Sequence, residues 1–147
     1  MKQFIAPSAS LTAPDNWSDF STYILAARRI GGFTPTVVIT QTPGIVDTDL
    51  NRQIERQLPE LQKLPNFRLV RRTEVQTLQI GDVAILEFSR SDPERNLHLF
   101  QYQMYVITSE TLYTLTATVR AEDYAARMPE LVAVVQSFRP ARWSPAL

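Results

Sequence analysis

Few side chains in this sequence are of a type that could do chemistry. His98 is the single histidine, and it lies between Leu97 and the pair Leu99-Phe100, an apolar stretch typical of a strand. A serine–histidine system needs a base with an orienting partner, and a multi-histidine metal site needs further histidines. A structural or surface role is therefore the better interpretation of His98, although an unrecognised serine hydrolase stays open as a third function class.

Two carboxylate pairs, Asp47 with Asp49 and Asp92 with Glu94, are the remaining candidates for acid–base chemistry. The first pair follows a proline–glycine turn signal and the second flanks a proline, so turn formation and helix capping are the better roles. The four glycines, at positions 31, 32, 44 and 81, form neither a GxGxxG motif nor a Walker loop. The sequence predicts a protein that is not an enzyme and uses no metal or cofactor.

The elements that would position any site follow from hydrophobic periodicity. Segments with alternating or β-branched apolar residues predict strands, and two segments with apolar residues every three or four positions predict helices. The predicted strands are 9–13, 20–28, 36–41, 67–77, 82–90, 97–107 and 111–119, and the predicted helices are 47–64 and 121–138. We therefore expect an α+β fold, an antiparallel sheet of about six or seven strands with two helices packed on one face.

Several local signals refine this expectation. Pro59 should kink or divide the first helix, and Pro129 should start a second segment of the last helix. Gly81-Asp82 and Ser109-Glu110 are short enough to be hairpin turns. Both faces of the strand at 20–28 are largely apolar, which predicts that neither face is fully exposed to water.

The strand at 97–107 has two unlike faces. One face carries Phe100, Tyr102, Met104 and Val106, which we expect to be core under the helices. The other face is mostly apolar but includes two glutamines, and such a surface suggests that something is laid against it. That face is made of Leu97, Leu99, Gln101, Gln103, Tyr105 and Ile107.

Composition bounds the class of protein. The 147 residues are 44% hydrophobic and 20% charged, which fits one domain spanning 1–147. Fifteen basic and fifteen acidic residues balance, which disfavours a general electrostatic grip on nucleic acid or on an anionic membrane. The lack of cysteine excludes disulfides and thiolate metal sites. The start has no apolar segment of signal-peptide length and no run reaches a membrane span, so we expect a soluble, cytoplasmic protein without direct membrane insertion.

The order of these pieces resembles the DcrB-like domain family, which has a PsbP-like fold, and more narrowly the Eag-type chaperones of type VI secretion effectors. The resemblance includes a proline–x–x–tryptophan–x–aspartate turn, two long strands with small hydroxyl residues, a helix with a leucine–proline exit, a glutamine-bearing strand and a closing serine–phenylalanine. The matching segments are 14–19, 21–24, 36–40, 56–67, 101–105 and 135–138.

The resemblance implies a non-enzymatic chaperone or adaptor in the cytoplasm of a bacterium. Its client would be the hydrophobic N-terminal transmembrane region of a secreted effector, often one with a PAAR domain, held in a cradle by a homodimer before export. Apolar cradle residues would bury client surface, and threonines and glutamines would supply polar contacts. Carried over by position, the candidate client-binding residues are Thr22, Ile24, Thr36, Thr40, Gln57, Leu61, Leu99 and Gln103, and Gln101 joins them on alternation alone.

Other interpretations of the mixed sheet face stay open. The face could be a plain dimer interface, or the protein's own tail could cover it. A module that binds a small molecule or a lipid through the same face is the alternative function; an enclosed pocket would favour it, whereas an open groove would favour a peptide or helix.

Overall fold

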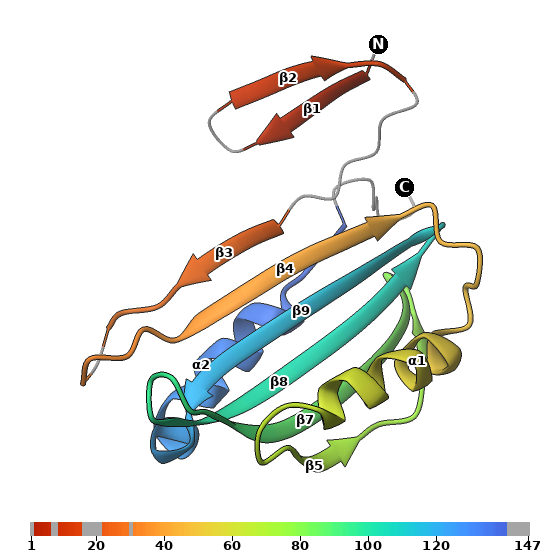
Figure 1. Cartoon of the computed structure of the whole chain (residues 1–147). Helices are drawn as coiled ribbons and strands as arrows, with labels where there is room; N and C mark the ends of the chain where they lie inside the picture. The colour runs from red at the N-terminus through yellow and green to blue at the C-terminus, as the bar shows by residue number, and fades with distance from the viewer. Residues whose placement is uncertain (1, 7–8, 16–21, 30, 141–147) are drawn as a thin grey trace.

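The computed structural model describes the backbone of residues 2–6 and 9–13 and all atoms of residues 14–15, 22–29 and 31–140. Part of the turn expected at 14–19 and the start of the strand expected at 20–28 lie outside these residues. The described chain forms a two-stranded hairpin, a seven-stranded sheet and two α-helices, in the arrangement drawn in Figure 1.

The seven-stranded sheet is antiparallel throughout and has the order β3-β4-β9-β8-β7-β5, with β6 also pairing with β7. The α+β class and the antiparallel sheet are confirmed. The strands are β3 (Thr22–Ala26), β4 (Thr36–Pro43), β5 (Arg68–Arg72), β6 (Gln76–Leu78), β7 (Gly81–Asp92), β8 (Leu97–Thr108) and β9 (Thr111–Arg120). The separate hairpin consists of β1 (Lys2–Ala6) and β2 (Ala9–Ala13).

The two helices lie on opposite faces of the sheet, so the prediction that both pack on one face is wrong (Figure 1). Helix α1 (Leu50–Gln62) packs on Tyr105 and Ile107 of β8, whereas α2 (Tyr124–Gln136) packs on Met104 and Val106. Since these four neighbouring residues alternate between the faces of β8, each face is apolar and needs its own cover. Alternation shows that two faces exist but does not say which helix covers which.

Helix α1 forms because Leu50, Ile54, Leu58 and Leu61 make one apolar stripe that packs on the sheet. Asp49 caps the start, where its carboxylate accepts a hydrogen bond from the Arg52 backbone nitrogen. Pro59 does not divide the helix, so that part of the expectation is wrong, because the helix continues past Pro59 to Gln62. Pro59 is exposed, so water can satisfy the carbonyl that loses its partner.

Helix α2 follows a short 3-10 turn, η1 (Ala121–Asp123), and is continuous through Pro129. The expectation that Pro129 starts a second segment is therefore wrong; the change of helix type comes earlier, at Tyr124. Within the described residues, neither α-helix is long and apolar enough to cross a membrane.

Two hairpin connections decide the register of the central strands. The turn expected at Ser109-Glu110 is confirmed, because Thr108 pairs with Thr111. The other turn is Gln79-Ile80 rather than Gly81-Asp82, and the strand expected at 67–77 is divided into β5 and β6. Gly81 begins β7 at φ +133°, where a Cβ atom would lie 2.1 Å from the Ile107 carbonyl oxygen. Only glycine allows these strands to approach so closely.

Candidate functional site

The sheet register brings most of the candidate residues onto one surface, the face that also carries α1. Three rows cross the four strands β3, β4, β9 and β8 in order, and we call this surface the threonine face. The rows are Thr22-Thr40-Thr114-Tyr105, Ile24-Val38-Thr116-Gln103 and Ala26-Thr36-Thr118-Gln101. Side chains opposite one another on antiparallel strands lie side by side, so hydroxyls, amides and a few apolar groups are interleaved there.

Hydrogen bonds hold both glutamines of the threonine face in place. The Gln103 amide nitrogen donates to the Thr116 hydroxyl at 3.1 Å, and the Gln103 carbonyl accepts from the Tyr105 hydroxyl. The Gln101 amide nitrogen donates to the Thr118 hydroxyl at 2.9 Å. Each amide nitrogen has one partner among the described residues, and an amide carries two N–H donors. The face is therefore ordered by its own hydrogen bonds.

Burial keeps Tyr105 in its donor form. The ring is fully buried, and the loss of solvation raises the pKa of its hydroxyl well above the usual value. The hydroxyl therefore stays protonated and donates to Gln103 rather than acting as a base.

The candidate residues differ in how much surface they offer. Ile24, at the sheet edge, is 66% exposed, and Gln103 is half-buried. Leu99 is only 1% exposed and Gln101 only 9%, so in this structure these two offer almost no surface to a partner. Their role as client contacts stays a prediction, as it does for the other candidates. Thr22 is exposed, and Thr36 and Thr40 are half-buried.

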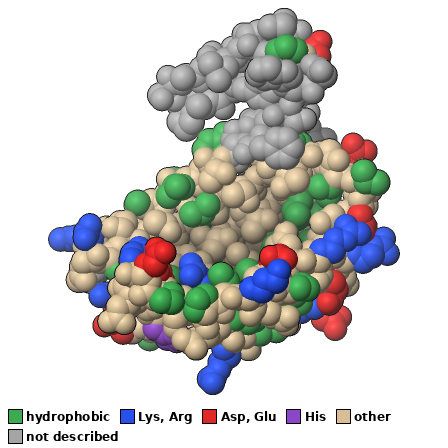
Figure 2. Space-filling model, viewed as in Figure 1, with side chains coloured by type: hydrophobic (Ala, Val, Ile, Leu, Met, Phe, Trp, Pro, Cys, Tyr) green, Lys and Arg blue, Asp and Glu red, His purple; other side chains and the backbone are tan. Residues whose placement is uncertain are grey.

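Helix α1 borders the threonine face on the β7 side. Leu61 belongs to the stripe that packs on the sheet, and Gln57 lies beside that stripe; both side chains are half-buried. Figure 2 shows this side of the molecule as hollowed, with an uncharged floor and with charged side chains around it. The two helix candidates thus lie at the border of the threonine face, and the strand candidates other than Leu99 lie in its three rows.

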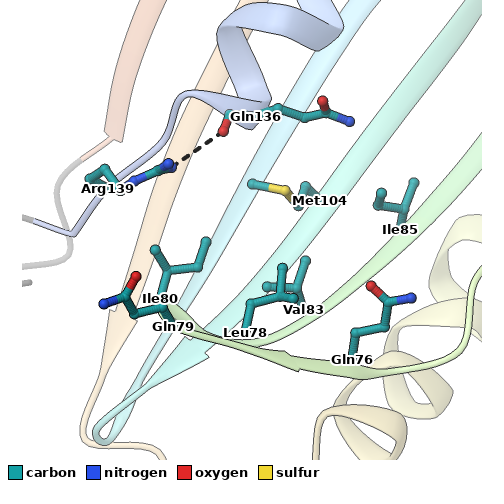
Figure 3. Close-up of a pocket in the computed structure, with 9 residues that line it drawn as sticks. All are labelled: Gln76, Leu78, Gln79, Ile80, Val83, Ile85, Met104, Gln136 and Arg139. Carbon is teal, nitrogen blue, oxygen red and sulfur yellow. Dashed lines mark hydrogen bonds between the residues drawn. The ribbon is translucent and has the colours of Figure 1, made fainter. Parts of the chain in front are cut away.

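The opposite face of the sheet has a hollow of its own, near the C-terminal end of α2 (Figure 3). None of the client-binding candidates lines it.

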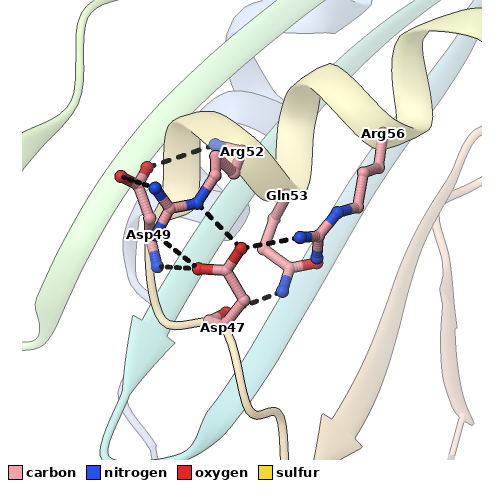
Figure 4. Close-up of polar contacts among 5 residues, drawn as sticks. All are labelled: Asp47, Asp49, Arg52, Gln53 and Arg56. Carbon is pink, nitrogen blue, oxygen red and sulfur yellow. Dashed lines mark hydrogen bonds and ion pairs between the residues drawn. The ribbon is translucent and has the colours of Figure 1, made fainter.

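The first carboxylate pair has structural contacts, and the predicted helix cap is confirmed for Asp49. Asp47 accepts from Arg52 Nε at 2.9 Å and from Arg56 Nη2 at 2.8 Å, beside the cap residue Asp49 (Figure 4). The hydrogen bond from Arg52 is the main reason that the pKa of Asp47 is lowered to about 2. An ion-paired carboxylate with so low a pKa is a poor general base at neutral pH.

Asp92 of the second carboxylate pair and His98 also have contacts with neighbouring side chains. Asp92 accepts from Arg95 Nε at 2.7 Å, and this bond lowers the pKa of its carboxyl group. His98 is exposed, and its Nδ1 lies 3.5 Å from the Ser91 hydroxyl. Over the part of the chain that the structure describes, no three histidine, cysteine or acidic side chains gather as a metal site would require.

The sequence reasoning missed the central part of the threonine face. Thr114, Thr116 and Thr118 occupy alternate positions of β9, so they share a face, and this signal is visible in the sequence. The apolar residues on the other alternate positions of β9 predict the strand equally well, so the strand assignment alone does not single out these threonines. Arg90 was missed as well; its Nε donates to the Gln101 carbonyl at 2.8 Å, a contact that depends on the pairing of β7 with β8.

The fold and the site together define an α+β protein with one helix on each face of an antiparallel sheet, and with a surface of interleaved polar and apolar side chains on one of those faces. The chain belongs to the DcrB family, whose model matches residues 8–137. This confirms the family-level part of the resemblance.

Solved structures share the fold, and two of them illustrate the range of similarity. PA94 from Pseudomonas aeruginosa, a protein of unknown function, is 21% identical with a TM-score of 0.79, and the match covers 99% of each chain. LpqN of Mycobacterium tuberculosis, involved in cell envelope biogenesis, is 14% identical with a TM-score of 0.54, over 82% of this chain and 84% of LpqN. No curated protein matches the sequence.

Proposed function

We propose that this protein is a cytoplasmic chaperone or adaptor that binds and shields the hydrophobic N-terminal transmembrane region of a type VI secretion effector, of the kind that carries a PAAR domain, before export. The observation that carries the proposal is the threonine face, with its three cross-strand rows of hydroxyl, amide and apolar side chains beside α1. The resemblance from which the proposal starts is confirmed at the level of the DcrB family.

A transmembrane helix in water exposes about 20 apolar residues and tends to aggregate. Helices that pack in membranes use small residues at close contacts and polar side chains as hydrogen-bond partners. The threonine face offers both kinds of group, since the small residue Thr116 lies in the same row as the amide of Gln103. The apolar residues Ile24 and Val38 complete that row. Its floor could therefore replace part of the membrane environment of a client helix.

One copy covers only one side of such a helix. Four strands about 4.8 Å apart make a floor about 15 Å wide, somewhat wider than the ~10 Å diameter of a helix. The side of the client away from the floor would stay in water, so a second copy facing the first would complete the shield. For this reason the proposal includes a homodimer.

Co-expression with a client segment tests the function. The N-terminal hydrophobic segment of a PAAR-domain effector, fused to a soluble reporter, should accumulate in the soluble fraction and co-purify with the tagged protein. A reporter that carries the effector's polar domain without this segment is the control and should not co-purify. Equal recovery of both reporters, or an insoluble hydrophobic segment in the presence of the protein, would contradict the proposal.

Two other results would redirect the assignment. Saturable binding of a small lipid to the threonine face, without capture of the hydrophobic segment, would support the small-molecule alternative. LpqN is involved in cell envelope biogenesis. Recovery of this protein in the envelope fraction of its own cells would therefore favour an envelope role over a cytoplasmic one.

A further inference from the structure

The cavity on the opposite side of the sheet from the threonine face carries a second inference, which does not depend on the proposed function. Helix α2 packs over β9, β4 and β8 and ends at Gln136, short of the corner where β6 and β7 meet. Among the described residues no helix covers this corner, and the hollow there has a volume of about 400 Å³. This volume lies within the usual range for small-molecule sites.

The floor of this cavity is apolar. Val83 and Ile85 of β7 and Met104 of β8 point into it from the sheet, as Figure 3 shows. The hairpin turn between β6 and β7 folds Ile80 back onto the core, and Leu78 beside it stays 49% exposed. An apolar floor with an exposed leucine at its margin is expected to gain from a hydrocarbon chain that excludes water.

The border of the cavity is polar and includes one basic side chain. Gln76, Gln79 and Gln136 contribute amide groups around the opening. Arg139 is the one charged side chain among the described residues that line it. The Arg139 Nη1 donates to the backbone carbonyls of Phe138 at 2.7 Å and Gln136 at 3.4 Å, which holds the guanidinium beside the end of α2.

We propose that this corner is a binding site for a single-chain anionic amphiphile, with the hydrocarbon chain on Val83, Ile85 and Met104 and a carboxylate at Arg139. A carboxylate matches the planar donor set of arginine, and the neighbouring amides provide further donors. A neutral or cationic head group would lose the charge complementarity. The lining of the cavity thus selects a fatty-acid-like ligand over a sugar or a nucleotide, because the floor has no polar group to bind either.

Decanoate is the probe, and its uncharged analogue decanol and the head-group fragment acetate are the controls. Binding is followed by two-dimensional NMR of the full chain, with affinities from the saturating shifts. Decanoate should shift the amides of β6, β7 and the end of α2, decanol should bind more weakly, and acetate should not bind. No saturable shift with decanoate, or equal affinities for decanoate and decanol, would overturn the proposal.

Variants locate the site. Arg139→Gln should lower the affinity for decanoate about tenfold, which is the loss expected for one hydrogen bond to a charged group. The affinity for decanol should not change. Ile85→Phe should fill the floor and abolish the binding of both decanoate and decanol. Gln136→Trp, at an exposed position, should narrow the opening, and it replaces Ile85→Phe if that variant folds poorly. Ile24→Phe on the threonine face is the matched control and should leave decanoate binding intact. Undiminished binding in Gln136→Trp and Arg139→Gln together would overturn the assignment, whatever the outcome for the effector segment.

Discussion

Gln103 of β8 and Thr116 of β9 are cross-strand partners, and the amide nitrogen of the glutamine donates to the threonine hydroxyl at 3.1 Å. On its other side the same amide accepts from Tyr105, two residues along β8. The three side chains form a chain of hydrogen bonds across the centre of the threonine face. A substitution at Gln103 therefore changes the surface that a client would meet without removing an apolar side chain from the core.

The substitution Gln103→Glu should abolish client binding and leave folding almost intact. In the free protein the carboxylate can accept from Tyr105 and Thr116 and is half open to water, so the thermal midpoint should change little. Against an apolar helix the charge would be buried without a counter-ion, at a cost of several kcal/mol, which predicts at least a tenfold loss of recovered client. Pull-down yield and thermal midpoint are measured together.

The control for this experiment is Ala133→Glu. It introduces the same charge at an exposed position of α2, on the opposite side of the sheet, and should change neither quantity. Full client recovery with Gln103→Glu, or a collapsed midpoint in the free protein, would show that the threonine face is not an open client site.

Asp47 should make stability depend on pH in the acid range. Its folded-state pKa, about 2, lies below the ordinary value of 3.8, so the ionised carboxylate favours the folded state above pH 3.8. This contribution is lost as the pH falls through about 2. Asp47→Asn should therefore lower the thermal midpoint at pH 6, and the difference from wild type should vanish near pH 2.

Salt provides an independent check on the Asp47 effect. The Arg52 and Arg56 side chains that pair with Asp47 are largely exposed, so molar salt should shrink the difference at pH 6. Glu110→Gln, at an exposed turn, serves as the comparison for loss of a carboxylate. A difference that persists unchanged at pH 2 would mean that the substitution Asp47→Asn disturbs the helix start for another reason.

Gly81→Ala should destabilise the fold far more than Gly32→Ala. Both glycines have positive φ, but a Cβ at Gly81 would meet the Ile107 carbonyl oxygen at 2.1 Å, whereas nothing lies within 4 Å of one at Gly32. Backbone strain and forced displacement of β8 together predict a loss of about 3 kcal/mol or more at Gly81. Strain alone predicts about 1–2 kcal/mol at Gly32. Urea unfolding of the two variants measures the difference, and equal losses would show that the close approach of β7 and β8 relaxes at no cost.

The proposed homodimer should be visible without any client. Light scattering coupled to gel filtration should give twice the chain mass of 16.8 kDa at micromolar concentration. A monomer across the whole micromolar range would remove the dimer from the proposal, and a client would then need two independent copies or a different cover for its outer side.

Much of the secondary structure was predictable because it depends on local periodicity. The strands at β4, β8 and β9 follow from apolar or β-branched residues on alternate positions, and α1 follows from a leucine and isoleucine stripe with an aspartate cap. Local patterns were less reliable where a neighbour decides the outcome. The prolines within the two helices do not divide them. Each proline leaves the carbonyl four residues earlier without its helical partner, and at an exposed position water can bind that carbonyl instead.

Tertiary structure alone decided which faces are covered and which residues meet. Since β8 is apolar on both sides, its sequence cannot say that α1 lies over Tyr105 and α2 over Met104. The cross-strand row that joins Ile24, Thr116 and Gln103 depends on the registers of three strand pairs. A register slip of one residue would send every one of these side chains to the other face, and the energy that prevents it comes from the whole core rather than from any one strand.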